Sequence, residues 1–179
     1  MSRRLTLEET AADHREAIED VVRALESLDS NLWAIARQPG KWSPAEVAEH
    51  LCLSYDPLFT ELDGGSGYVL RVQGWKRLLA RWRYLPVILE RGVFPPGVRA
   101  PREARPVGHA ASAQLAAARL AESASRFERR LIEAQTSGPV RLTHAYFGKL
   151  AAPQILRLLA VHARHHRRQL PAGPARTGP

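Results

Sequence analysis

Apolar residues recur every three or four positions along several stretches of the chain, and short segments rich in proline and glycine separate these stretches. Such spacing places the apolar side chains on one face of an α-helix. It predicts helices over 7–36, 43–62, 73–91, 112–135 and 151–171. Pro57 is expected to kink the second of them. No segment shows a convincing strand-like alternation, so the pattern predicts an all-α fold.

The second helix has the clearest start signal. Ser43 is a suitable N-cap, Pro44 suits the first helical position, and Glu46 stands where the glutamate of a capping box belongs. We therefore expect this helix to begin at Ser43.

The lengths of the connections predict how the helices are arranged. Short links join the first helix to the second and the 112–135 helix to the last, which makes antiparallel neighbours. About fifty residues separate the two middle core helices, and they include the helix over 73–91 and a proline-rich connection from Gly92 to His109. A long connection of this kind can cross a bundle. The prediction is a single domain over 1–170, an up-down-down-up four-helix bundle, followed by a disordered tail over 171–179.

Composition narrows the possible surroundings and partners. No apolar run approaches the roughly 20 residues that span a bilayer, so no membrane partner is expected. The first residues lack an apolar signal segment, and the single cysteine, Cys52, suits a reducing compartment, so a cytoplasmic location is expected. The net charge is +8, but the arginines are dispersed and no nucleic-acid module accompanies them. Specific nucleic-acid binding is therefore not expected.

Histidines in the last helix carry the candidate chemistry. His162 and His166 are one turn apart on the expected helix. With Ile155, Leu159 and Gln169 they fall within an arc of about 80° around the helix axis, whereas His165 points to the side. A histidine pair at this spacing offers two nitrogens to one metal ion. Solvated surface histidines are the alternative, and this stretch leaves the choice open. His50, on the edge of the apolar face of the second helix, is a candidate third ligand or a half-buried polar residue.

Three segments resemble one known family. The segments 41–51 (KWSPAEVAEHL), 144–150 (HAYFGKL) and 162–169 (HARHHRRQ) resemble, in this order, the motifs of the DinB-like (YfiT-type) superfamily. The resemblance spans about residues 7–170. It implies a four-helix bundle with a divalent metal held by His50, His162 and His166. It also implies a link to enzymes that use low-molecular-weight thiols such as bacillithiol or mycothiol, and to dimers.

The donor set suggests what such a site would do. Three neutral imidazoles suit zinc, nickel or iron(II) and leave a position for water or a small-molecule substrate. The leading hypothesis is a thiol S-transferase or a hydrolase; the alternatives are a non-catalytic, dimeric binding or structural module and weak nucleic-acid association. Candidate catalytic residues are Gln169, Glu46, which could orient His50 or only cap its helix, and His144.

Two further expectations concern the segments around the site. The connection over 92–109 is expected to cover the mouth of the site, where its arginines could bind the carboxylates of an acidic thiol. The tryptophan-rich helix over 73–91 is a candidate homodimer interface. The candidate arginines are Arg99, Arg102 and Arg105.

Overall fold

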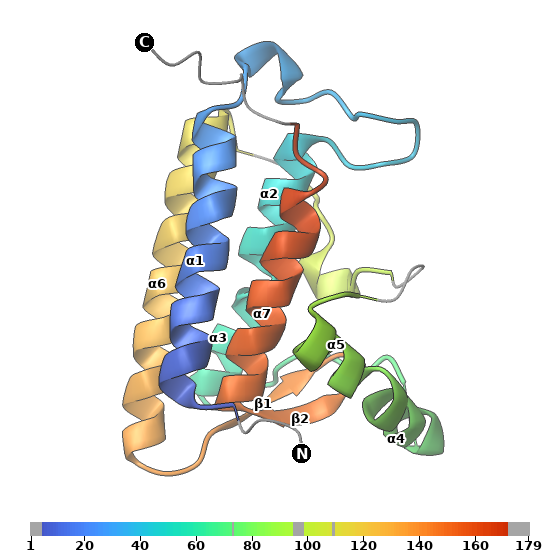
Figure 1. Ribbon diagram of the computed structural model, residues 1–179, viewed down its shortest axis with the longest axis vertical. Helices are drawn as coiled ribbons and strands as arrows, with labels where there is room; N and C mark the ends of the chain where they lie inside the picture. The colour runs from blue at the N-terminus through green and yellow to red at the C-terminus, as the bar shows by residue number, and fades with distance from the viewer. Residues whose placement is uncertain (1–4, 73, 95–98, 109, 172–179) are drawn as a thin grey trace.

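The computed structural model describes residues 5–72, 74–94, 99–108 and 110–171. The chain is mostly helical (Figure 1). Its helices are α1 (Leu7–Glu26), α2 (Pro44–Leu53), α3 (Asp56–Leu62), α4 (Gly74–Arg83), α5 (Leu85–Arg91), α6 (Ala113–Thr136) and α7 (Ala152–Arg167), with the 3-10 turns η1 (Ser30–Leu32) and η2 (Arg102–Ala104). Two strands, β1 (Arg141–His144) and β2 (Gly148–Ala151), precede α7. The predicted tail lies outside the described residues except for Pro171, as do positions 95–98 and 109 of the predicted connection.

The long helices lie side by side. α1 packs most extensively on α7 and also contacts α6, while α2 packs on α6. In Figure 1, α1 and α7 run in one direction and α2 and α6 run in the opposite one. α5 packs on α7, and α4 extends from α5 at the side of the molecule.

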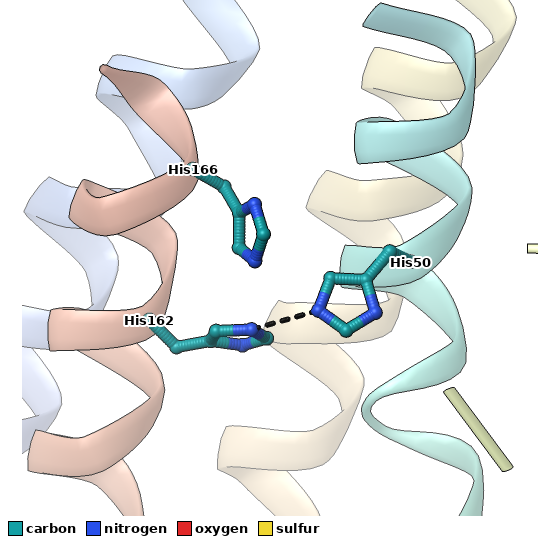
Figure 2. Close-up of side chains that lie close together, drawn as sticks. All are labelled: His50, His162 and His166. Atoms are coloured by element: carbon teal, nitrogen blue, oxygen red, sulfur yellow. Dashed lines mark hydrogen bonds between the residues drawn. The ribbon is translucent and has the colours of Figure 1, made fainter. Parts of the chain in front are cut away.

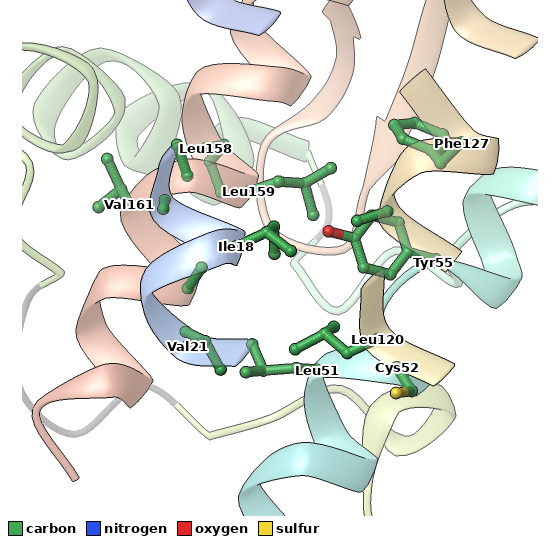
Figure 3. Close-up of a cluster of buried hydrophobic side chains, with 14 of the residues drawn as sticks. Ile18, Val21, Leu51, Cys52, Tyr55, Leu120, Phe127, Leu158, Leu159 and Val161 are labelled. Carbon is green, nitrogen blue, oxygen red and sulfur yellow. The ribbon is translucent and has the colours of Figure 1, made fainter. Parts of the chain in front are cut away.

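The core lies where the apolar faces of these helices meet (Figure 3). Val21 of α1, Leu51 of α2, Leu120 and Phe127 of α6 and Leu159 of α7 are all buried. The shared apolar faces account for the predicted helical periodicity. Cys52 is also buried in this core, and burial raises the pKa of its thiol to about 12.

The first helix is shorter than predicted. α1 ends at Glu26 rather than at Ala36, and the chain turns through η1. The cause is local: Asp29 caps η1, its side chain accepting a hydrogen bond from the Asn31 backbone at 3.3 Å. Short polar side chains of this type compete with helical hydrogen bonds.

Prolines divide two of the predicted helices. The 43–62 helix is interrupted rather than kinked: α2 ends at Leu53, and Pro57 lies in the first turn of α3. The 73–91 helix is divided in the same way, with Pro86 in the first turn of α5. Proline lacks the amide hydrogen that a helix interior uses, so a new helix begins at each of these positions.

The all-α prediction is wrong in one place, the link before α7. β1 and β2 form an antiparallel hairpin in which Leu142 pairs with Leu150 and His144 pairs with Gly148. Gly148 has φ of 70°, which favours glycine at this position. Each strand has four residues, too few for a convincing alternation in the sequence.

In the described part of the chain, no helix has the length and apolar character that crossing a membrane requires.

Candidate metal centre

α2 carries the first of the clustered histidines. The capping box predicted from the sequence is present: Ser43 N donates to Glu46 Oε2 at 2.8 Å, and Glu46 N donates to Ser43 Oγ at 3.3 Å. These bonds define where α2 begins. One turn after Glu46, His50 lies on the inner side of the helix and is buried.

α7 carries the other two. His162 and His166 stand one turn apart on the face that is turned toward α2 (Figure 2). His166 is buried and His162 is half-buried. The apolar residues on either side of them, such as Leu159 and Ala163, belong to the core, so helical packing fixes the direction of both imidazoles.

The three side chains converge on one point between the two helices. Each offers one ring nitrogen to a group whose members all lie within 4.8 Å of one another. The Nε2 atoms of His50 and His162 are 2.9 Å apart, and the ring centroid of His166 is 4.7 Å from each of the other two. The predicted cluster of His50, His162 and His166 is therefore present as a geometric feature (Figure 2).

A backbone carbonyl orients His50. Nδ1 of His50 donates to the carbonyl oxygen of Ala104 in η2 at 2.5 Å. A carbonyl can only accept, so the proton of the neutral ring is on Nδ1 and Nε2 has a free lone pair. In the bond between the two Nε2 atoms, His162 is then the donor.

A side-chain amide orients His166. Nδ1 of His166 donates to Oε1 of Gln169 at 2.9 Å, and Nε2 of Gln169 donates to Nε2 of His165 at 3.1 Å. The first of these bonds leaves Nε2 of His166 with a free lone pair. Hydrogen bonds of this kind fix the tautomer and orientation of metal-binding histidines in proteins. His165 is half-buried and lies to the side of the cluster, with its ring centroid 5.8 Å from that of Phe94.

Burial keeps the clustered imidazoles neutral. It lowers the pKa of His50 to about 4 and that of His166 to about 3. Burial also lowers the pKa of His162 well below its usual value, and the neighbouring rings of His166 and His50 add to the effect. At neutral pH the cluster offers uncharged nitrogens, which is the form that binds metal ions.

Two aromatic rings flank the cluster. Trp42, which precedes α2, has its ring centroid 4.7 Å from that of His50 and 5.9 Å from that of His166. Phe94, which follows α5, lies 5.9 Å from His162 and 5.8 Å from His165. Both rings are half-buried, so they limit the access of water to the imidazoles.

The chain matches a known protein family. A family model described as the DinB superfamily matches residues 13–170, a range that includes all three histidines. The chain belongs to the DinB superfamily. No curated protein and no solved structure gives a significant match to the chain.

The donor set of this DinB superfamily member fits a divalent ion. Metal–nitrogen bonds of about 2.0–2.1 Å place two imidazole nitrogens on one ion about 3 Å apart, close to the separation of the two Nε2 atoms here. For His162 to bind through Nε2, its proton must move to Nδ1. Three neutral nitrogens would then face one point.

The remaining sequence candidates have other contacts. Glu46 accepts a hydrogen bond from Ser43 in the helix cap. The sequence made Glu46 a candidate to orient His50, but the hydrogen bond to Nδ1 of His50 is made by the carbonyl of Ala104. His144 is stacked on Phe147, and its Nδ1 accepts a hydrogen bond from the Tyr146 backbone at 3.3 Å. It does not belong to the cluster of His50, His162 and His166 found among the described residues.

The connection between α5 and α6 contributes more to the site than its sequence indicated. Phe94 lies against the histidine rings, as a cover over the mouth of the site would, and Ala104 supplies the acceptor for His50. A backbone carbonyl leaves no signal in a sequence, so this contact could not have been found there. Arg99, Arg102 and Arg105 are exposed on the same connection.

Proposed function

We propose that this DinB superfamily member is a metal-dependent enzyme whose ion is bound by His50, His162 and His166. The convergence of three ring nitrogens within 4.8 Å carries the proposal. Two of these rings are held by hydrogen bonds through Nδ1, which leaves Nε2 for the ion. Zinc, nickel and iron(II) are the ions that such a set of neutral imidazoles suits.

We infer that the reaction is either S-transfer from a low-molecular-weight thiol, such as bacillithiol or mycothiol, or hydrolysis. A divalent ion with three protein ligands supplies Lewis acidity that ionises a thiol or a water near neutral pH. The chain supplies the surroundings: Gln169 holds His166, Ala104 holds His50, and Trp42 and Phe94 restrict water.

Recognition of a small acidic substrate is consistent with the charge near the mouth. Arg99, Arg102 and Arg105 lie on the connection that also supplies Phe94 and Ala104. Guanidinium groups bind carboxylates through paired hydrogen bonds. We therefore assign the carboxylates of the substrate to this side of the site.

The proposal includes the setting of the enzyme. We infer that α1, α2 with α3, α6 and α7 form an up-down-down-up four-helix bundle, and that the protein works in the cytoplasm. The directions of these helices and the single buried cysteine support the inference. A homodimer remains an expectation from the family.

The first experiment is the metal content of protein purified without an affinity tag and without added metal. We expect about one divalent ion per chain in the wild type and none in His50→Ala, with His165→Ala as the matched control that keeps the ion. Thiol-dependent and hydrolytic reactions would then be screened with that ion bound. If neither protein contains an ion, and neither takes up zinc, nickel or iron(II), the enzyme proposal fails and a non-catalytic module is favoured.

A further inference from the structure

α4 is orientated in an unusual way. Its four large apolar side chains, Trp75, Leu78, Leu79 and Trp82, have the spacing of one helical face, yet they are 69%, 68%, 49% and 74% exposed. No residue of α4 is buried. An amphipathic helix of a globular protein normally turns such a face toward the core, and α4 turns it toward the solvent.

The polar side of α4 is the side attached to the protein. Nη1 of Arg81 donates to the carbonyl oxygens of Phe147 and Lys149 in the hairpin, at 3.1 and 2.7 Å. Arg77 lies over Gly148, where a Cβ would be 3.4 Å from Cδ of the arginine. These contacts hold the apolar face of α4 outward, so its exposure follows from the packing.

A groove of about 700 Å³ separates α4 from the hairpin. Arg77, Arg81, Arg141 and Lys149 line it, and Trp75 and Leu78 form part of its wall. Lys149 is paired with Glu61. Within the described part of the chain, the side chains of Arg77 and Arg141 form no hydrogen bond or ion pair, so both charges are available to an anion.

Charge selects the occupant of this surface. α4 carries four basic residues and no acidic one, and Lys76 and Arg83 lie together along one edge of the apolar face. Two copies of α4 packed on each other would bring like charges together. An anionic bilayer fits better, because tryptophans are favoured at the membrane interface and basic side chains beside them attract anionic lipids.

We propose that α4 and the adjoining groove bind the surface of a membrane that contains anionic phospholipid. The apolar face enters the interface, while Arg77 and Arg141 bind a lipid phosphate in the groove. The absence of a spanning helix among the described residues does not bear on this mode of binding, since an interfacial helix lies in the plane of the membrane. The surface is separate from the histidine cluster and does not depend on the proposed reaction.

The test is co-sedimentation with vesicles, with tryptophan fluorescence as a second readout. We expect binding to vesicles of equal parts phosphatidylcholine and phosphatidylglycerol to be at least about tenfold stronger than binding to pure phosphatidylcholine, and to weaken with added salt. Trp75 and Trp82 are exposed, so their emission should shift to shorter wavelength on binding.

Matched variants locate the effect. Leu79→Ala with Trp82→Ala, and Arg77→Gln with Arg141→Gln, should each reduce binding at least about tenfold. Leu115→Ala with Arg129→Gln changes an exposed apolar residue and an exposed arginine on α6 and should leave binding unchanged. Equal binding to both kinds of vesicle, or equal binding by all variants, would overturn the proposal.

Two other occupants give different results. If inorganic phosphate displaces the protein from vesicles and the apolar variant binds normally, the groove is a site for free anions. If no vesicle binding occurs and sedimentation velocity detects a dimer that Trp82→Ala dissociates, the partner is a second copy. Either result would overturn the assignment to a membrane.

Discussion

Two groups of buried histidines in the described part of the chain differ in the partners of their ring nitrogens. His14 of α1 is 1% exposed; its Nε2 accepts a hydrogen bond from the Tyr55 hydroxyl at 2.8 Å, and its Nδ1 faces Oε2 of Glu128 at 3.5 Å. Arg15 in turn binds Glu128 at 2.7 Å. His50, His162 and His166 instead direct nitrogens at one another.

The difference separates a structural histidine from a candidate ligand. The Tyr55 hydroxyl binds one ring nitrogen of His14, and the Glu128 carboxylate faces the other nitrogen at 3.5 Å without a hydrogen bond, so neither nitrogen is directed at another imidazole. Three neutral imidazoles complement one another only in part. Each has one proton, and those of His50 and His166 are bound to Ala104 and Gln169, so only the proton of His162 is directed into the cluster. Burial alone therefore does not identify a metal site; the partners of the ring nitrogens do.

The largest expected effect is the loss of the ion from His162→Ala. This change removes one of three ligands without filling the site, so we expect metal content to fall from about one ion per chain to none while the circular dichroism spectrum is kept. His165→Ala is the matched control, because His165 is on the same helix but lies to the side of the three clustered histidines and contacts Gln169. If both variants keep full metal content, the assignment of the three ligands is wrong.

The next effect is the acid sensitivity of the metal-free protein. The pKa values of His50 and His166 are about 4 and about 3 in the folded chain, against about 6.5 in an unfolded one. Between pH 6.5 and 4 the unfolded chain therefore binds protons that the folded chain does not, and the free energy of unfolding should fall by several kcal/mol as the pH is lowered.

Urea unfolding of EDTA-treated protein at a series of pH values measures this loss. His166→Leu removes one of the titrating groups and should make the dependence on pH shallower. A wild-type stability that stays constant from pH 6.5 to 4 would mean that the imidazoles take up protons in the folded protein.

Truncation of His14 should lower the free energy of unfolding and leave the metal ion bound. His14→Ala leaves a cavity and removes the partner of the buried Tyr55 hydroxyl, so we expect a loss of about 2–4 kcal/mol in the free energy of unfolding. Tyr55→Phe removes only the hydroxyl and should cost about 1 kcal/mol. Urea unfolding and metal analysis of the same samples measure both effects. Loss of the ion from His14→Ala would contradict the assignment of His14 as a purely structural histidine.

A smaller effect is expected from Gln169→Ala. The side chain of Gln169 holds Nδ1 of His166, and loss of such an orienting contact weakens metal binding by about 10–100-fold. Competition with a metal chelator measures the change. Gln169→Glu keeps an acceptor for Nδ1 and should recover most of the affinity. Unchanged affinity in Gln169→Ala would restrict this residue to the end of α7.

The sequence predicted the clustered residues better than their surroundings. His162 and His166 could be paired from helical spacing. His50 was added by the resemblance to the DinB-like motifs, since its position at the edge of its helix left it as either a ligand or a half-buried polar residue. The contacts that orient them were less accessible: the Ala104 carbonyl comes from backbone geometry in a connection without periodicity. The aromatic neighbours Trp42 and Phe94 depend on how separate segments pack.

The fold shows the same division between regular and irregular segments. Both ends of α6 were predicted within one residue, because an apolar face over many turns leaves a strong pattern. The end of α1 was misplaced by about ten residues, since the apolar spacing continues past Glu26 while Asp29 and Asn31 form a capped turn. The hairpin was missed because its strands are short.

The smallest effect resolves the two roles that the sequence left open for Glu46. In the structure its carboxylate accepts hydrogen bonds from the backbone and the hydroxyl of Ser43, and Nδ1 of His50 is bound to Ala104. Glu46→Ala should therefore lower the free energy of unfolding by about 1 kcal/mol through the lost cap and leave metal affinity within about twofold of the wild type. Ser43→Ala removes the other half of the cap and should have a similar effect. A large loss of metal affinity in Glu46→Ala but not in Ser43→Ala would instead show that Glu46 positions His50, in addition to the carbonyl of Ala104 that binds Nδ1 of His50.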